Sequence, residues 1–134
     1  MHPSFVKADK LTKEVIGAAI EVHRSIGAGL LESIYENCLM RELEIRNIPF
    51  KNQVIVPIQY KGYKFQHNLK LDLYIDDCLI IELKSIEKVL PIHKAQLLSY
   101  MKLLNSPLGL IFNFYELVLT KGISRCMLPG SNQE

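Results

Sequence analysis

The sequence has no uninterrupted run of 18 or more apolar residues, so we expect no transmembrane helix and no membrane partner. Its first residues, Met-His-Pro-Ser-Phe-Val-Lys, lack the apolar region of a signal peptide. It has three cysteines, and no two of them form a Cys-x-x-Cys pair, so neither a zinc site nor an iron–sulfur cluster is expected. Free thiols of this kind fit a reducing compartment, and we expect a cytoplasmic protein.

Neither sign of charge dominates the chain. Sixteen Lys and Arg residues face 14 Asp and Glu residues, and the net charge of +2 permits a nucleic-acid partner without arguing for one. With 134 residues, 49% of them hydrophobic, the chain is long enough for one domain with a real core. We expect a single domain over residues 1–134, with a core at about 11–127 and flexible tails.

Hydrophobic spacing predicts the order of elements. Apolar residues at helical spacing, with glycine and proline at the ends, predict three helices, over about residues 12–26, 31–46 and 91–104. Alternating or short apolar runs predict four strands, at about 54–58, 63–75, 79–84 and 108–114, with weaker candidates at 117–120 and 123–127. Lys61-Gly62 fits a two-residue hairpin turn between the first two strands. This order, α-α-β-β-β-α-β, predicts an α/β or α+β fold with a mixed sheet flanked by helices. The connection through the third helix is the one candidate for a parallel crossover.

Three charged residues, Asp72, Glu82 and Lys84, interrupt the apolar stretch from 69 to 84. A buried charge is costly unless it is paired or bound to a metal. Two carboxylates could hold Mg²⁺ or Mn²⁺, which prefer oxygen ligands, and the backbone carbonyl of Leu83 could add another. Lys84 could hold a water or stabilise charge on a phosphate. A buried ion pair, or an edge strand with solvated charges, would explain the same residues without a metal.

The turn between these two strands decides whether the charges meet. Side chains alternate along a strand, so Glu82 and Lys84 share a face. A two-residue turn would set Asp72 opposite Ile81, on the wrong face, whereas a three-residue loop from Asp76 to Cys78 sets it opposite Glu82. If these residues form one site, we therefore predict the three-residue loop or an equivalent bulge.

Other candidates lie on the helices. Glu32 is in the first turn of the second helix, either as ordinary charge placement at a helix N-terminus or as a third carboxylate of the metal site. Gln96 and Tyr100 share a face of the third helix with His93. They could contact a phosphate backbone or a base, or Tyr100 could pack in the core while Gln96 faces solvent. Asn113, within an apolar strand, needs a hydrogen-bond partner, which could be backbone alone.

Taken together, these residues resemble the PD-(D/E)XK nuclease superfamily and, within it, the small GxxExxY proteins. Three motifs carry the resemblance, in the family's order: Gly29, Glu32 and Tyr35; Asp72 with Glu82-Leu83-Lys84; and Gln96 with Tyr100, the QxxxY motif of RecB-type nucleases. Leu71 stands where the superfamily name has Pro, at a position that varies widely. The cysteine cluster of RecB-type nucleases is absent.

The resemblance implies a restriction-endonuclease-like core of order α-β-β-β-α-β and Mg²⁺-dependent (or Mn²⁺-dependent) hydrolysis of phosphodiester bonds in nucleic acid, with DNA as the expected substrate. It implies these site residues: Asp72 and Glu82 as metal ligands, with Leu83 and Glu32 beside them, Lys84 for the attacking water, and Gln96 and Tyr100 in support. A catalytically silent module that binds nucleic acid or a protein partner is the alternative. The small size suggests a homodimer or a larger protein partner.

Overall fold

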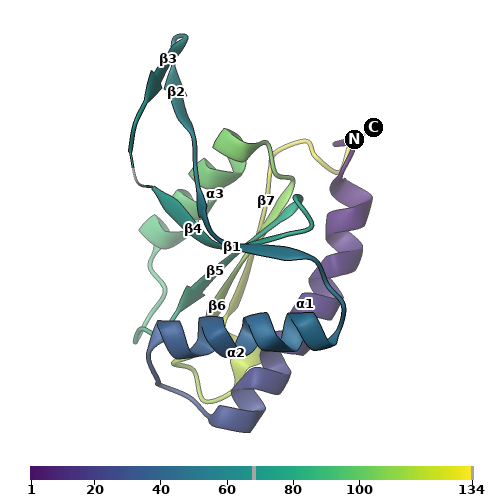
Figure 1. Ribbon diagram of the computed structural model, residues 1–134, viewed down its shortest axis with the longest axis vertical. Helices are drawn as coiled ribbons and strands as arrows, with labels where there is room; N and C mark the ends of the chain where they lie inside the picture. The colour runs from purple at the N-terminus through teal and green to yellow at the C-terminus, as the bar shows by residue number, and fades with distance from the viewer. Residues whose placement is uncertain (68, 134) are drawn as a thin grey trace.

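The computed structural model describes residues 1–67 and 69–133. A five-stranded sheet of order β1-β4-β5-β6-β7 forms the centre, with α1 and α2 over one face and α3 over the other (Figure 1). The elements are α1 (Phe5–Ile26), α2 (Glu32–Ile45), β1 (Phe50–Ile55), β2 (Ile58–Tyr60), β3 (Tyr63–Phe65), β4 (Lys70–Ile75), β5 (Leu79–Lys84), α3 (Pro91–Leu104), β6 (Leu108–Asn113), the 3-10 helix η1 (Leu119–Gly122) and β7 (Ile123–Met127). Within the described ranges, no helix combines the length and the apolar character needed to cross a bilayer.

The fold is α+β with a mixed sheet, as predicted. β5 and β6 are parallel and are joined through α3, so the predicted crossover is confirmed, and the other neighbouring pairs of this sheet are antiparallel. The predicted core order corresponds to α2-β1-β4-β5-α3-β6. Apolar side chains fill both faces of the sheet, one cluster packing under α1 and α2 and the other under α3.

Helix α1 begins at Phe5, so the predicted start near Thr12 was wrong. Thr12 is buried inside the helix, and its hydroxyl donates a hydrogen bond to the carbonyl of Ala8, at 2.9 Å. A start near Thr12 was predicted because threonine side chains often bond to free backbone N–H groups at helix starts. Thr12 instead bonds back to the preceding turn, and Ala8 is fully buried in the core.

Two predicted strands are each divided in the structure, and one weak candidate is absent from the sheet. The predicted strand at 54–58 is split into β1 and β2, with Pro57 between them, because proline has no N–H for a ladder. The predicted strand at 63–75 is split into β3 and β4, and its residue 68 lies outside the described residues. The candidate at 117–120 bends into η1, which ends at Gly122. A Cβ at Gly122 would lie 2.5 Å from the carbonyl oxygen of Asn113, so only glycine fits this close to the end of β6. The candidate at 123–127 is confirmed as β7.

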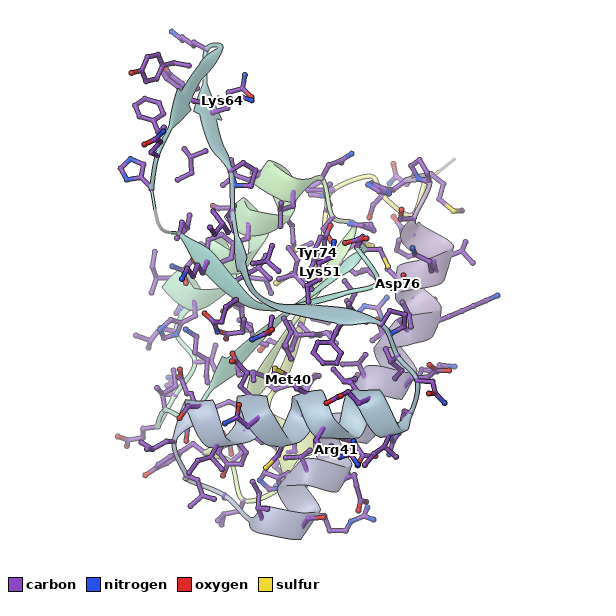
Figure 2. All side chains as sticks on the ribbon, viewed as in Figure 1. Met40, Arg41, Lys51, Lys64, Tyr74 and Asp76 are labelled. Carbon is purple, nitrogen blue, oxygen red and sulfur yellow. The ribbon has the colours of Figure 1, made fainter. Side chains whose placement is uncertain are left out.

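The turn between β4 and β5 has the predicted three residues. Leu73 pairs with Ile81 and Ile75 pairs with Leu79, so residues 76–78 form the loop. Asp76 and Asp77 adopt φ values of 47° and 56°, a left-handed conformation that Asp tolerates better than most residues. Asp76 is labelled at this turn in Figure 2, beyond the paired strands β1 and β4.

Helix α3 approaches the sheet closely over Gly109 of β6. A Cβ at this position would lie 2.8 Å from Cδ1 of Leu97 and 3.0 Å from Sδ of Met101, both of which are buried side chains of α3. Glycine therefore allows the helix to sit low on the sheet. This contact also fixes the height above the sheet of Tyr100, the residue just before Met101. Tyr100 lies close enough to Glu82 and Asp72 for their charges to raise its pKa, after the larger effect of burial.

The substitution Gly109→Ala should destabilise the protein by about 1–3 kcal/mol, because the added methyl group forces a packed helix away from the sheet. Thermal unfolding or urea titration measures this change. Gly17→Ala is the matched control, since its Cβ would meet only the guanidinium end of Arg46, at 3.1 Å, and alanine favours a helix interior. Equal stability of Gly109→Ala and wild type would contradict the close packing.

Candidate functional site

Asp72 and Glu82 lie on neighbouring strands at the point where β4 and β5 separate. The ladder pairs Leu73 with Ile81, and the same register, extended by one residue, places Asp72 opposite Glu82. There the backbone ladder gives way to a side chain, because Oδ2 of Asp72 accepts the N–H of Leu83 at 2.8 Å. This bond fixes one oxygen of the Asp72 carboxylate next to Glu82.

Glu82 is a buried carboxylate without a matching partner. Its side chain is 8% exposed. Among the described residues, its Oε1 is the one buried side-chain oxygen or nitrogen that has no hydrogen-bond partner. Burial, and then the negative charge of Asp72, raise the pKa of Glu82 to about 9, although the Lys84 ammonium partly opposes this shift. At neutral pH and without a cation, Glu82 therefore carries a proton.

The chain just after Lys84 is held firmly. The backbone carbonyl of Lys84 accepts the N–H of Phe114 at 2.8 Å. The side-chain amide of Asn113, which is 2% exposed, accepts the N–H of Ile86 at 3.1 Å and donates to its carbonyl at 2.9 Å. Asn113 thus finds the hydrogen-bond partners that a buried amide needs, and they are backbone groups. Lys84 itself is only partly exposed. Its positive charge lowers the pKa of Glu82, which opposes part of the rise caused by burial and by Asp72.

The glycine and tyrosine of the first motif anchor the start of α2. Gly29 has φ of 79° and donates its N–H to the carbonyl of Phe114 at 3.1 Å. Tyr35 is fully buried and stacks on the ring of Phe114, with centroids 4.2 Å apart. Its hydroxyl donates to the carbonyl of Gly27 at 2.6 Å and accepts the N–H of Leu30 at 3.0 Å. These residues are structural, and they fix α2 against the end of β6.

Glu32 faces the site from the first turn of α2. Its Oε1 accepts the N–H of Ser85, one residue past Lys84, at 3.3 Å. It shares with Asp72 a surface hollow of about 210 Å³, lined by Glu32, Ser33, Glu36, Gln53, Asp72 and Leu83. The structure therefore brings Glu32 to the same hollow as Asp72, and its role as a metal ligand stays a prediction.

Glu36 and Gln53 also line this hollow, although neither was predicted from the sequence. Nε2 of Gln53 donates to Oε1 of Glu36 at 2.6 Å and lies 3.4 Å from Oδ1 of Asp72, so it bridges the two acids. The pKa of Glu36 is raised by burial, lowered by the bond from Gln53, and raised further by the charge of Asp72. Glu36 could have been found from its position one helical turn after Glu32.

Gln53 has an unusual backbone for a strand residue. Its neighbours in β1 pair normally with β4, Asn52 with Leu73 and Val54 with Leu71, so Gln53 lies opposite Asp72. Its φ is 50°, in the left-handed region that non-glycine residues seldom adopt. Such local strain is concentrated at functional sites. No sequence signal marks this conformation.

The two motif residues of α3 differ in placement. Tyr100 is 5% exposed and packs in the core under α3, and its pKa is raised by burial and then by the charges of Glu82 and Asp72. Gln96 is exposed, and none of the hydrogen bonds among residues 1–67 and 69–133 involves its side chain. His93, on the same helix, accepts the N–H of Leu90 with Nδ1 at 2.9 Å and so caps the helix.

The residues present suit a hard divalent cation. No three His, Cys, Asp or Glu side chains of the described chain gather into a metal-binding cluster. The available donors are instead the carboxylates of Asp72 and Glu82, with the Leu83 carbonyl between the motif residues. The unpartnered Oε1 and the raised pKa of Glu82 are what two close carboxylates show when their counter-charge is missing. Oxygen donors of this kind fit Mg²⁺ or Mn²⁺.

Comparison with known proteins gives one match. Residues 9–126 match the family model of the PD-(D/E)XK nuclease superfamily. No curated protein and no solved structure matches the chain. The match covers all the motif residues predicted from the sequence, and together with the α+β architecture it confirms the expected restriction-endonuclease-like fold. It is a match to the superfamily, and membership of the GxxExxY proteins stays a prediction.

Replacement of Glu82 by Gln should remove a pH-dependent weakness of the metal-free protein. Between its ordinary pKa of 4.5 and its folded pKa of about 9, Glu82 keeps a proton that the unfolded chain has lost. Its contribution to stability is therefore complete below pH 4.5 and is lost as the pH rises toward 9. In a chelator at high pH, the Tm of Glu82→Gln should exceed that of wild type by several degrees. A difference of about 1 kcal/mol in the free energy of unfolding corresponds to roughly 4 °C in Tm.

Thermal melting across this pH range measures the difference. Glu14→Gln, at an exposed glutamate of α1, is the control and should follow wild type. A large loss of stability in Glu82→Gln would instead favour a structural ion pair of Glu82 with Lys84.

Proposed function

The chain belongs to the PD-(D/E)XK nuclease superfamily, and we propose that it is a Mg²⁺-dependent nuclease that hydrolyses phosphodiester bonds of nucleic acid, with DNA as the expected substrate and Mn²⁺ as an alternative ion. One observation carries the proposal: a buried Glu82 with an unpartnered oxygen, set opposite Asp72 where two strands separate. A binding module has no need to bury the Glu82 carboxylate beside a second carboxylate, whereas a metal site does.

In this proposal, Asp72 and Glu82 hold the ion, with the carbonyl of Leu83 as a further ligand. The bound ion supplies Lewis-acid stabilisation of the phosphate and a lowered pKa for a bound water. Asp72 is well suited to hold a fixed position, because one of its oxygens is already bonded to the N–H of Leu83. Glu82 would hold the ion as the carboxylate, so its proton would first be released to solvent.

Lys84 then orients the attacking water or stabilises negative charge on the phosphate. Its support is its place on the same face as Glu82 and the backbone bond that fixes its carbonyl to Phe114. Glu32 and Glu36 are acidic side chains of α2 that would be able to take up a proton at the site. Both stand in the same hollow as Asp72.

The α3 residues complete the proposed site. The hydroxyl of Tyr100 is protonated at neutral pH, as in any tyrosine, and would be able to donate a hydrogen bond toward the carboxylates or a phosphate. Gln96, exposed one turn earlier on the same helix, is free to contact substrate. These two residues are therefore assigned to support of the site and of the nucleic acid rather than to the metal.

A cleavage assay tests the function directly. Single-stranded and duplex DNA and RNA are incubated with wild type in Mg²⁺, in Mn²⁺ and in chelator. Cleavage should need the ion, and Lys84→Ala should lower its rate by roughly 10²-fold or more, the usual cost of losing one group that stabilises developing charge. Lys10→Ala, which removes an exposed lysine of α1, is the charge-matched control and should cleave normally.

Cleavage that survives chelation, or that is unchanged in Lys84→Ala, would contradict the assignment of this site. Binding of nucleic acid without cleavage under any of these conditions would favour the catalytically silent module.

A further inference from the structure

A hairpin arm, defined as residues 57–67, projects from the body of the protein (Figure 1). Its strands β2 and β3 pair only with each other and form a separate two-stranded sheet. It begins where the N–H of Val56 donates to the carbonyl of Leu69 at 2.7 Å. Neither apolar core includes a residue of the arm. A lone hairpin is marginally stable, so burial in this protein's core does not explain its presence.

The arm carries large rings in solvent. Tyr60 is 63% exposed, Tyr63 is 67% exposed and Phe65 is 42% exposed. Tyr63, Phe65 and His67 stand at alternate positions, and their rings contact one another in series, with centroids 4.9 Å and 6.0 Å apart. This row of exposed rings is a surface for another molecule, because a free protein gains nothing from leaving aromatic area in water.

The arm and the residues just before and after it carry positive charge and no negative charge. From residue 50 to residue 71 the sequence has four lysines and no Asp or Glu. Lys51 pairs with Asp77 at the far end of β1. Lys61, Lys64 and Lys70 take part in none of the ion pairs found among the described residues. Lys61 lies over the ring of Tyr60, at 5.3 Å, and Figure 2 labels Lys64 on the arm.

The arm leads directly into the acidic site. The chain runs from Lys70 through Leu71 to Asp72, and Lys70 is the first residue of β4. At about 3.3 Å per extended residue, Phe65 lies within roughly 23 Å of Asp72. That distance corresponds to about seven nucleotides of a stacked strand. One molecule can therefore touch the rings and reach the site at once.

We propose that the arm binds single-stranded nucleic acid, with bases stacked on Tyr60, Tyr63 and Phe65 and phosphates beside its lysines, and that it directs the strand toward Asp72. The inference rests on the proposed nuclease function and narrows its substrate to unpaired strands. Rings can stack only on bases that are not already stacked within a duplex. A second copy of the chain is a poorer occupant, because its identical lysines would repel those of the first.

The test measures binding, without metal, of a fluorescent 12-nucleotide single strand (DNA or RNA) and of a duplex of the same length. Fluorescence anisotropy should show that Tyr63→Ala and Phe65→Ala each weaken single-strand binding roughly tenfold, the usual effect of losing one stacked ring. Duplex binding should change little. Tyr63→Phe keeps a ring and should bind as wild type, and Tyr115→Ala, an exposed tyrosine outside the arm, is the control.

A second variant separates the contribution of the lysines to binding from that of the aromatic rings. Lys61→Gln combined with Lys64→Gln should weaken single strands and duplex alike, and should reduce the salt dependence for single strands by about 1.4 in log K per log salt, about 0.7 for each phosphate contact. Thermal melting of all variants should match wild type, since the arm lies outside both cores.

Three results would overturn the proposal: no single-strand binding by wild type, equal binding by the ring variants and wild type, or a wild-type dimer that the ring variants convert to monomer. The last result would make the arm a self-association surface. Failure of the nuclease function is distinct, because ring-dependent binding without cleavage refutes the function alone. Cleavage of single strands at the same rate by wild type and by the ring variants would refute the proposed role of the arm and leave the nuclease function standing.

Discussion

Two carboxylates, Asp72 and Glu82, meet across the end of a strand pair where one of them is almost fully buried. The loss of water on burial, and then the negative charge of Asp72, raise the pKa of Glu82, so the arrangement is costly without a cation. Much of the surrounding structure keeps them in place. The left-handed turn sets the register, and the N–H of Leu83 fixes Asp72. On the far side of β5, Asn113 holds the chain that follows Lys84.

The glycine and the tyrosine of the first motif have structural roles rather than chemical ones. Gly29 and the buried hydroxyl of Tyr35 fix the loop before α2, and the stacking of Tyr35 on Phe114 joins that loop to the strand next to β5. As a result, Glu32 and Glu36 face Asp72 from a helix that cannot shift easily. The hollow and the arm have opposite charge: the acidic hollow suits a cation, and the basic arm suits an anion.

The element order and the key register could be predicted from the sequence, because hydrophobic period and alternation report directly on burial. The three-residue turn followed from requiring Asp72 and Glu82 to share a face, and the strand pairing confirms it. Other features depend on contacts between distant segments. The bridge from Gln53 to Glu36 needs a left-handed strand residue, and the early start of α1 needs Ala8 in the core. The hairpin turn of the arm at Lys61-Gly62 was predicted, and the pairing of Tyr60 with Tyr63 confirms it. The separation of the arm from the main sheet was not predicted, because its two strands lie within runs that alternate like ordinary strands.

The most direct test of this account is to count the protons released when Mn²⁺ binds at pH 7, by calorimetry in two buffers of different ionisation enthalpy. If Glu82 is a ligand with a metal-free pKa of about 9, wild type should release close to one proton per ion. Glu82→Gln should bind more weakly and release almost none. Equal affinity of the two proteins, with no proton released by either, would contradict a metal site built on Asp72 and Glu82.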